Sequence, residues 1–131
     1  MREDIIAAIS GCPAHIQADL NGPCRQAMAF LDDYLPQSER VACISSAAVK
    51  VTGGAPTNSV LAFTDRRLLF VAPRPQTLAW PLTAIDNVHA AYGFMVERGG
   101  ATTHLGIDAG WGKEFVDRLH VAMAVATLVS A

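Results

Sequence analysis

The spacing of apolar residues along this chain changes at Pro36. Before Pro36, apolar side chains recur every three to four positions, which is the period of an amphipathic helix. They predict helices over Arg2 to Ser10 and Ala14 to Leu20, and a third helix with Pro23 in its first turn. Glycine and proline separate these segments. Residues 1–36 are therefore predicted to form a helical N-terminal extension.

After Pro36 the period shortens to two, the alternation of a half-buried strand. Seven short strands are predicted in this way, at residues 41–51, 59–64, 67–72, 78–82, 85–90, 92–97 and 103–107. Arg98-Gly99-Gly100 predicts a hairpin, because glycine tolerates a positive φ. Pro81 has no N–H to donate, which predicts that its strand lies at a sheet edge.

The last predicted element is a helix from about Gly110 onward, and it carries two apolar stripes. Residues four apart form the first stripe, which we expect to pack on the sheet: Trp111, Phe115, Leu119 and Met123. Glu114 and Arg118 have the spacing of an ion pair on the same helix. The second stripe lies on the last turns and consists of Val121, Val125, Leu128 and Val129. These apolar side chains would be exposed to water unless other residues pack on them. The packing partner is either another subunit or the chain's own N-terminal helices, through Ile5, Ile9, Phe30 and Leu31.

Three motifs carry a family resemblance. They are Leu35-Pro36-Gln37-Ser38-Glu39-Arg40-Val41, Leu61-Ala62-Phe63-Thr64-Asp65-Arg66-Arg67-Leu68-Leu69-Phe70 and Trp80-Pro81-Leu82-Thr83-Ala84-Ile85. They resemble the L-P-x-x-E-x-V, L-x-x-T-x-x-R-L-L-F and x-P-L-x-x-I motifs of bacterial pleckstrin-homology-like (PH-like) domains, the YokE-like group. The resemblance runs from Leu35 to the end of the chain and implies a PH-like domain over residues 37–131.

The resemblance implies an α+β fold, and the order of strands followed by one helix favours the same class. Its sheet would be bent and antiparallel, or a partly open barrel, with about seven strands. A C-terminal helix would cap that sheet, and the helical N-terminal extension would precede it. Members of the family are taken as interaction modules, and no catalytic residue is carried over from them.

The proportion of charged residues indicates which kinds of binding partner to expect. Only 17% of the residues are charged, against about 25% in an average soluble domain. A surface poor in charge favours cover by another subunit, and an alanine-rich coding bias would explain the same numbers. The net charge of −2 gives no general attraction to nucleic acid or to anionic membranes.

The cysteines bear on location. Cys12, Cys24 and Cys43 have no CxxC spacing and are typical of buried thiols in a reducing cytosol. The segment that ends at Cys12 resembles a lipoprotein box, but no basic, long apolar leader precedes it. Since no apolar run reaches the roughly 20 residues of a bilayer span, we expect a soluble, cytoplasmic protein.

Residue types that act in catalysis or bind metal ions are scattered along the sequence. His15, His89, His104 and His120 lie far apart, and Cys12 with His15 lacks a second closely spaced ligand pair. No nucleophile motif, phosphate-binding loop or dinucleotide motif is present. We therefore expect no enzyme activity, cofactor or metal. Nucleic-acid binding is not expected either, because no basic patch is interleaved with aromatic residues.

These observations favour a non-enzymatic binding or scaffold module that engages a protein partner or forms a homo-oligomer. The predicted interaction residues are Val121, Val125, Leu128 and Val129, together with Arg66 and Arg67 of the hairpin. The alternative is a module for an anionic ligand or a lipid surface, which would use Lys50, Arg66, Arg67 and Arg74. In the leading interpretation Arg66 and Arg67 project into solvent, and Thr64 and Asp65 cap the turn.

Overall fold

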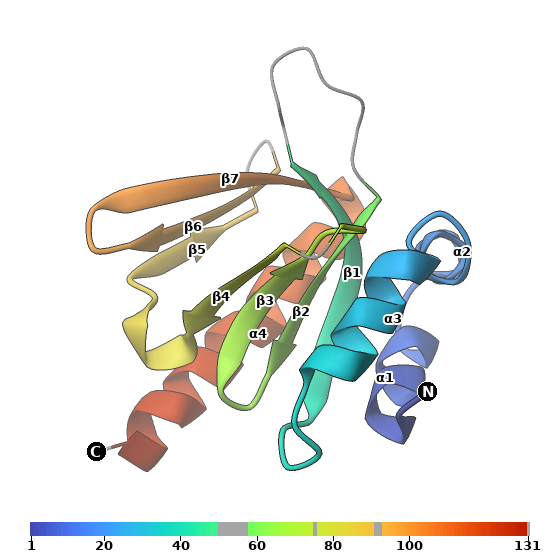
Figure 1. Cartoon of the computed structure of the whole chain (residues 1–131). Helices are drawn as coiled ribbons and strands as arrows, with labels where there is room; N and C mark the ends of the chain where they lie inside the picture. The colour runs from blue at the N-terminus through green and yellow to red at the C-terminus, as the bar shows by residue number, and fades with distance from the viewer. Residues whose placement is uncertain (50–57, 75, 91–92, 131) are drawn as a thin grey trace.

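The computed structural model describes residues 1–49, 58–74, 76–90 and 93–130 (Figure 1). In these ranges the helices are α1 (Glu3–Ser10), α2 (Ala14–Asn21), α3 (Arg25–Tyr34) and α4 (Ala109–Ser130), with a 3-10 turn η1 (Leu82–Ala84). The strands are β1 (Val41–Val49), β2 (Ser59–Thr64), β3 (Arg67–Val71), β4 (Thr77–Pro81), β5 (Asn87–His89), β6 (Phe94–Arg98) and β7 (Ala101–Ile107). The predicted strand positions Val51 and Tyr92 lie outside the described residues.

The strands form one antiparallel sheet in the order β4-β3-β2-β1-β7-β6-β5. Strand β1 joins its two halves, since it pairs with β2 over most of its length and with β7 only from Ala47 onward. Figure 1 shows β5–β7 crossing at a steep angle to β2–β4, which makes the sheet bent and open. The predicted α+β fold, with about seven antiparallel strands, a C-terminal helix and an N-terminal helical region, is confirmed.

The prediction that Pro81 lies at a sheet edge is also confirmed. The Ala72 N–H donates to the Gln76 carbonyl at 3.0 Å, and the Leu82 N–H donates to the Arg66 carbonyl at 2.9 Å. Hydrogen-bonded pairs alternate along an antiparallel ladder, so the backbone groups of Thr77, Ala79 and Pro81 point away from β3. The missing N–H of Pro81 therefore falls on the open edge of β4.

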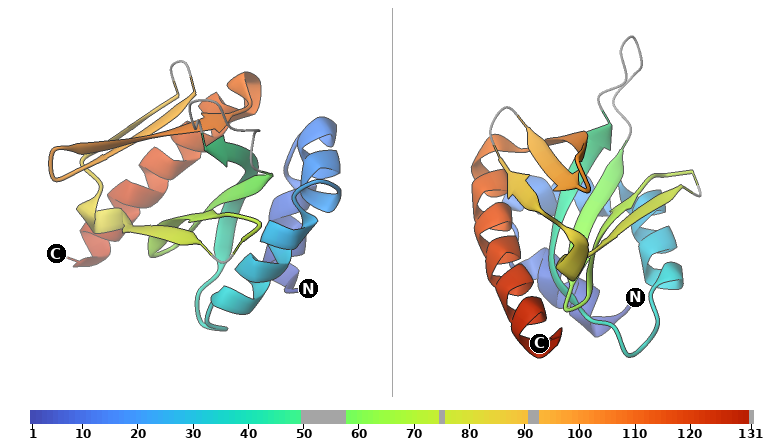
Figure 2. Two further views of the ribbon diagram at one scale, coloured as in Figure 1. Left: turned by 45° about the horizontal axis from the view of Figure 1, so that its top comes forward. Right: turned by 90° about the vertical axis from the view of Figure 1, so that its left-hand side faces the viewer.

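Helices cover the sheet on two sides. Helix α4 packs against β1, η1 and β5, whereas α1, α2 and α3 pack against β1, β2 and β3. Figure 2 shows the two groups of helices flanking β1–β3 from opposite sides. The residues of β2 are all buried. The half-buried alternation expected for residues 41–51 is found on the described part of β1, where Val41, Cys43 and Ala47 are buried, whereas Ala42, Ser46 and Ala48 are exposed or half-buried and Ile44 is the exception. Strand β2 is apolar on both faces, and both are buried because the N-terminal helices form a layer of their own on the second face.

The N-terminal helices share one core with the rest of the chain. The side chains of Ile5, Ile16 and Leu31 are fully buried in the cluster that also holds the sheet residues. Helix α3 begins at Arg25. Pro23 therefore lies in the turn before the helix and not in its first turn, where the sequence predicts it. The N-terminal extension with α1, α2 and α3, which we call the helical arm, thus folds onto its own sheet.

The first stripe of α4 forms the other half of the core. The ring of Phe115 contacts Phe63 and Phe94 edge to face, with centroids 5.2 and 6.0 Å away. The Trp111 indole N–H donates to the Ile44 carbonyl at 2.9 Å. Leu119 is fully buried. Burial of this stripe on the sheet is confirmed, apart from Met123, which is only partly buried.

The three cysteines are buried free thiols, as predicted. Burial raises the pKa of Cys12 to about 12 and that of Cys24 to about 11. Of the helices in the described ranges, none combines the length and the apolar character that crossing a bilayer requires.

Candidate interaction surface

The second stripe of α4 is exposed. Its members are Val121, Val125, Leu128 and Val129, which are 65%, 53%, 76% and 80% exposed. At 3.6 residues per turn, Val121, Val125 and Leu128 lie on the side of the helix away from the buried Phe115 and Leu119, whereas Val129 lies five turns after Trp111 and points in the same direction as that residue. Figure 1 shows the last turns of α4 running past η1 to a corner of the molecule. We call these four residues the α4 stripe.

The structure decides one alternative left open by the sequence. The N-terminal helices pack on the far face of β1–β3, and Ile5, Ile9 and Leu31 are buried there. Phe30 is partly buried against the same core. Cover of the α4 stripe by these residues is therefore wrong, and within the described chain the stripe faces solvent.

Toward the start of α4 the same side of the helix is charged. Arg118 Nε donates to Glu114 Oε1 at 2.9 Å, which confirms the predicted ion pair. The Arg118 guanidinium also lies over the Trp111 ring, 5.3 Å from its centroid. The surface along α4 is thus polar and internally paired up to Arg118 and apolar from Val121 onward.

The hairpin between β2 and β3 places its two arginines differently. Thr64 Oγ1 accepts the backbone N–H of Arg66 at 3.0 Å and that of Arg67 at 3.1 Å, the turn cap predicted for Thr64. Arg66 is exposed, as expected. The expectation that Arg67 is solvated is wrong, because its Nε donates to Glu39 Oε2 at 2.9 Å. The Glu39 side chain is only 4% exposed.

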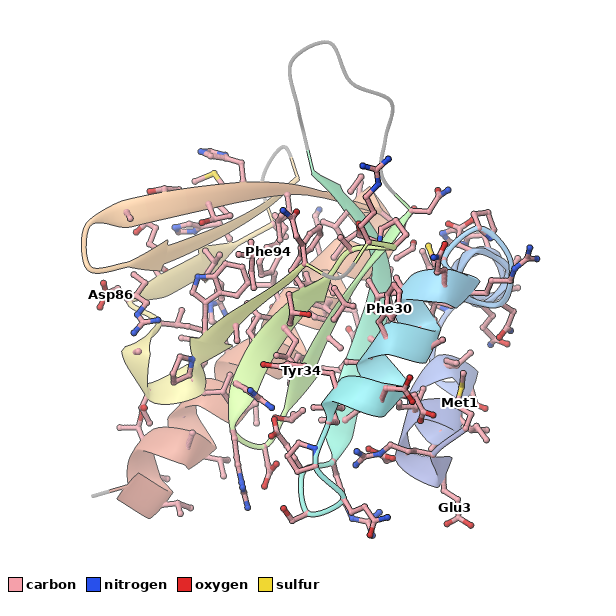
Figure 3. The ribbon with its side chains drawn as sticks, in the orientation of Figure 1. Met1, Glu3, Phe30, Tyr34, Asp86 and Phe94 are labelled. Carbon is pink, nitrogen blue, oxygen red and sulfur yellow. The ribbon has the colours of Figure 1, made fainter. Side chains whose placement is uncertain are left out.

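Two further groups complete the surroundings of this ion pair. Thr64 Oγ1 donates to Glu39 Oε2 at 2.7 Å. The Tyr34 ring lies under the Arg67 guanidinium, with its centroid 4.9 Å away, and its hydroxyl accepts from Arg67 Nη1 at 3.2 Å. Figure 3 shows Tyr34 between the end of α3 and this hairpin. The pair therefore joins the helical arm to the sheet.

The pKa shifts follow from these contacts. Burial alone would raise the pKa of Glu39, but the hydrogen bonds from Arg67 and Thr64 outweigh it and hold that pKa below its usual value. The Glu39 hydrogen bond in turn raises the pKa of Arg67. The positive charge of Arg67 is thus largely neutralised by Glu39, which makes Arg67 a structural residue.

Of the four cations proposed for an anion site, the three that the structure describes do not converge. Arg66 and Arg67 lie at one end of β3, whereas Arg74 follows its other end. The five residue steps from Arg67 to Ala72 span about 16 Å at about 3.3 Å each. Lys50 lies outside the described residues.

Other polar residues form small, separate groups. His15 Nε2 pairs with Asp108 Oδ1 at 3.1 Å. An open groove of about 390 Å³ between β5 and α4 is lined in part by His89, Lys113 and His120. Within the part of the chain that the structure describes, no three His, Cys, Asp or Glu side chains lie close enough together to hold a metal ion.

Comparisons with known proteins give no family. No protein-family model matches this sequence, and no curated protein matches it. Membership of the PH-like family stays a prediction from the three motifs. The structure brings residues of two of these motifs together. Glu39 belongs to the first motif and Thr64 and Arg67 to the second, and these residues meet in one buried cluster.

Proposed function

We propose that this chain is a non-enzymatic PH-like interaction module that associates with itself through the α4 stripe. The observation that carries the proposal is the run of large apolar side chains left in water on the last turns of α4. Other large exposed apolar side chains in the described ranges are dispersed over the N-terminus, α1, α3 and β4: Met1, Ile6, Tyr34 and Leu78. Scattered residues of that kind are normal on protein surfaces.

The open edges of the sheet are poor alternatives for self-association. On β4 the outward position of Pro81 lacks a donor, so a neighbouring strand would leave a carbonyl unpaired. On β5 the Val88 N–H already donates to the Asn87 side chain at 2.9 Å. Pairing of a second copy along β5 would have to break this contact. Helix α4 is therefore the better surface.

The free energies of burial and of association predict that two copies of the α4 stripe bind each other weakly. Fully burying one Val or Leu side chain contributes about 1.5–3 kcal/mol. Four such side chains on each copy, already partly covered, would together supply about 8–16 kcal/mol. Association itself costs about 4–15 kcal/mol. Mid-range values of the two leave a net of only about −3 kcal/mol, which corresponds to a millimolar dissociation constant, since about 1 mM corresponds to about −4 kcal/mol.

A charge placed in the stripe tests the proposal. In light scattering after size exclusion, the parent mass should rise above 13.9 kDa as the concentration approaches roughly 1 mM. Val125→Glu should stay monomeric. Thr127→Glu is the matched control, because Thr127 is exposed on another side of the same turns, and it should behave like the parent. A parent mass that stays at the monomer value throughout would refute self-association.

Binding of an anionic ligand or a lipid surface receives less support, because Arg67 is paired with Glu39 and lies far from Arg74. A cytoplasmic location goes with the favoured proposal, since Cys12, Cys24 and Cys43 are free thiols. Sedimentation with anionic vesicles at low and high salt separates the two functions. Salt-sensitive binding would favour the lipid surface over self-association.

A further inference from the structure

We propose that the partner at the α4 stripe is a second copy of this chain in antiparallel orientation, with Val121 of one copy against Val125 of the other. This inference rests on the proposed self-association and adds its geometry. It predicts a two-fold axis that crosses the helix pair midway between Val121 and Val125. Each copy then contributes the same surface, as a two-fold interface requires.

The spacing along α4 supports helix pairing. Five residues on the exposed side follow one another in steps of four, three, four and three: Glu114, Arg118, Val121, Val125 and Leu128. This is the alternation of the contact positions in paired helices. Val at two of these positions and Leu at another provide side chains of the kind that fill such a seam.

The antiparallel register gives each seam residue a suitable neighbour. With Val121 opposite Val125 of the second copy, the next positions outward bring Arg118 opposite Leu128. Arg118 is already held by Glu114 and by the Trp111 ring. Its methylene groups can cover Leu128 of the second copy while its guanidinium keeps those partners. The charged half of the seam thus covers the end of the apolar half.

A parallel pair lacks this complementarity. In register, it would place Arg118 beside Arg118 and Glu114 beside Glu114 of the second copy. Like charges facing each other across a helix pair oppose that orientation. The antiparallel register brings neither pair of like charges together, and the apolar part of the seam contains no charged residue.

Disulfide trapping tests the orientation. A tagged Val121→Cys variant and an untagged Val125→Cys variant are mixed in a glutathione redox buffer. Mass spectrometry of the intact proteins then distinguishes the mixed disulfide dimer from the two self-paired dimers and gives the amount of each. A disulfide needs Cα atoms within about 7 Å. Self-paired Val121 positions would be offset along the axis by about 6 Å, four residues at about 1.5 Å each. With about 5 Å between facing Cα atoms of helices whose axes are about 10 Å apart, the self-paired Cα atoms would be about 8 Å apart, beyond that limit. The mixed dimer should therefore exceed each self-paired dimer by about tenfold.

Two controls define the background. The parent should form no disulfide dimer, because Cys12, Cys24 and Cys43 are buried. Thr127→Cys lies on another side of the helix and should not cross-link either. The melting temperature of each variant shows that the fold is intact.

Each other outcome overturns the inference. Self-paired dimers that equal or exceed the mixed dimer would indicate parallel helices and leave self-association standing. A concentration-dependent mass without any cross-link through the stripe would place the interface elsewhere. A constant monomer mass in light scattering would refute the orientation together with the proposed function.

Discussion

Arg67 Nε donates to Glu39 Oε2 at 2.9 Å, and this bond joins the segment just before β1 to the β2–β3 hairpin. The carboxylate is almost completely buried and accepts a second hydrogen bond from Thr64, and Tyr34 contacts the Arg67 guanidinium. Such a pair is costly to break on one side only, because the other charge is then left buried without a partner.

Arg67→Ala should destabilise the fold by about 3 kcal/mol, because Glu39 would lose its charged partner inside the protein. Arg66→Ala is the control from the neighbouring position. Its side chain is exposed, so its urea midpoint should equal that of the parent. Urea unfolding followed by tryptophan fluorescence measures both. Equal midpoints for the two variants would show that the Glu39–Arg67 pair contributes little.

Acid should remove the same stabilisation. The folded-state pKa of Glu39 lies below its value in the unfolded chain, so its contribution is present above about pH 4.3 and is lost as the pH falls through the folded pKa. The pKa values of Asp4 and Asp108 are lowered too. The parent should therefore lose stability steadily below about pH 5.

Glu39→Gln identifies the share of Glu39 in this acid response. The variant should be less stable than the parent at neutral pH, and the two curves of unfolding free energy should converge as the pH falls. Parallel curves would mean that the other carboxylates account for the whole acid response.

Much of the fold could be predicted because its elements are encoded locally. Alternation gave the strands, the Trp111 to Leu119 stripe gave the buried face of α4, and Pro81 gave a sheet edge. These signals depend on residues within a few positions of one another. The α4 stripe could be predicted for the same reason.

The Glu39–Arg67 pair could not be predicted in this way. The two residues are 28 positions apart, and periodicity carries no information about which turn faces which strand. The helical cover of the sheet was missed for a similar reason. Val60 and Ala62 are apolar on one face of β2, and Leu61 and Phe63 on the other, which is typical of burial on both faces. The local pattern does not say which layer covers the second face.

Phe115→Ala should cost about 3–5 kcal/mol, the range for truncating a buried phenylalanine. The ring is fully buried and contacts both halves of the sheet through Phe63 and Phe94. Lys113→Ala on the same helix is the control, because Lys113 is exposed and lies outside the α4 stripe, and this change should leave the melting temperature nearly unchanged. If Phe115→Ala melted like the parent, α4 would not cover the core.

The neighbouring residues Ile5 and Ile6 test whether the helical arm belongs to the folding unit. Ile5 is fully buried and Ile6 is about half exposed, although both lie on α1. Ile5→Ala should therefore cost about 2–5 kcal/mol, whereas Ile6→Ala should change stability little. Both variants have the same change in helix propensity, so the difference between their urea midpoints isolates packing of the arm on β1. Unfolding of Ile5→Ala should remain a single transition, because the arm and the sheet share one core. A separate early transition for α1–α3, with the sheet melting at the parent midpoint, would make the arm an independent unit.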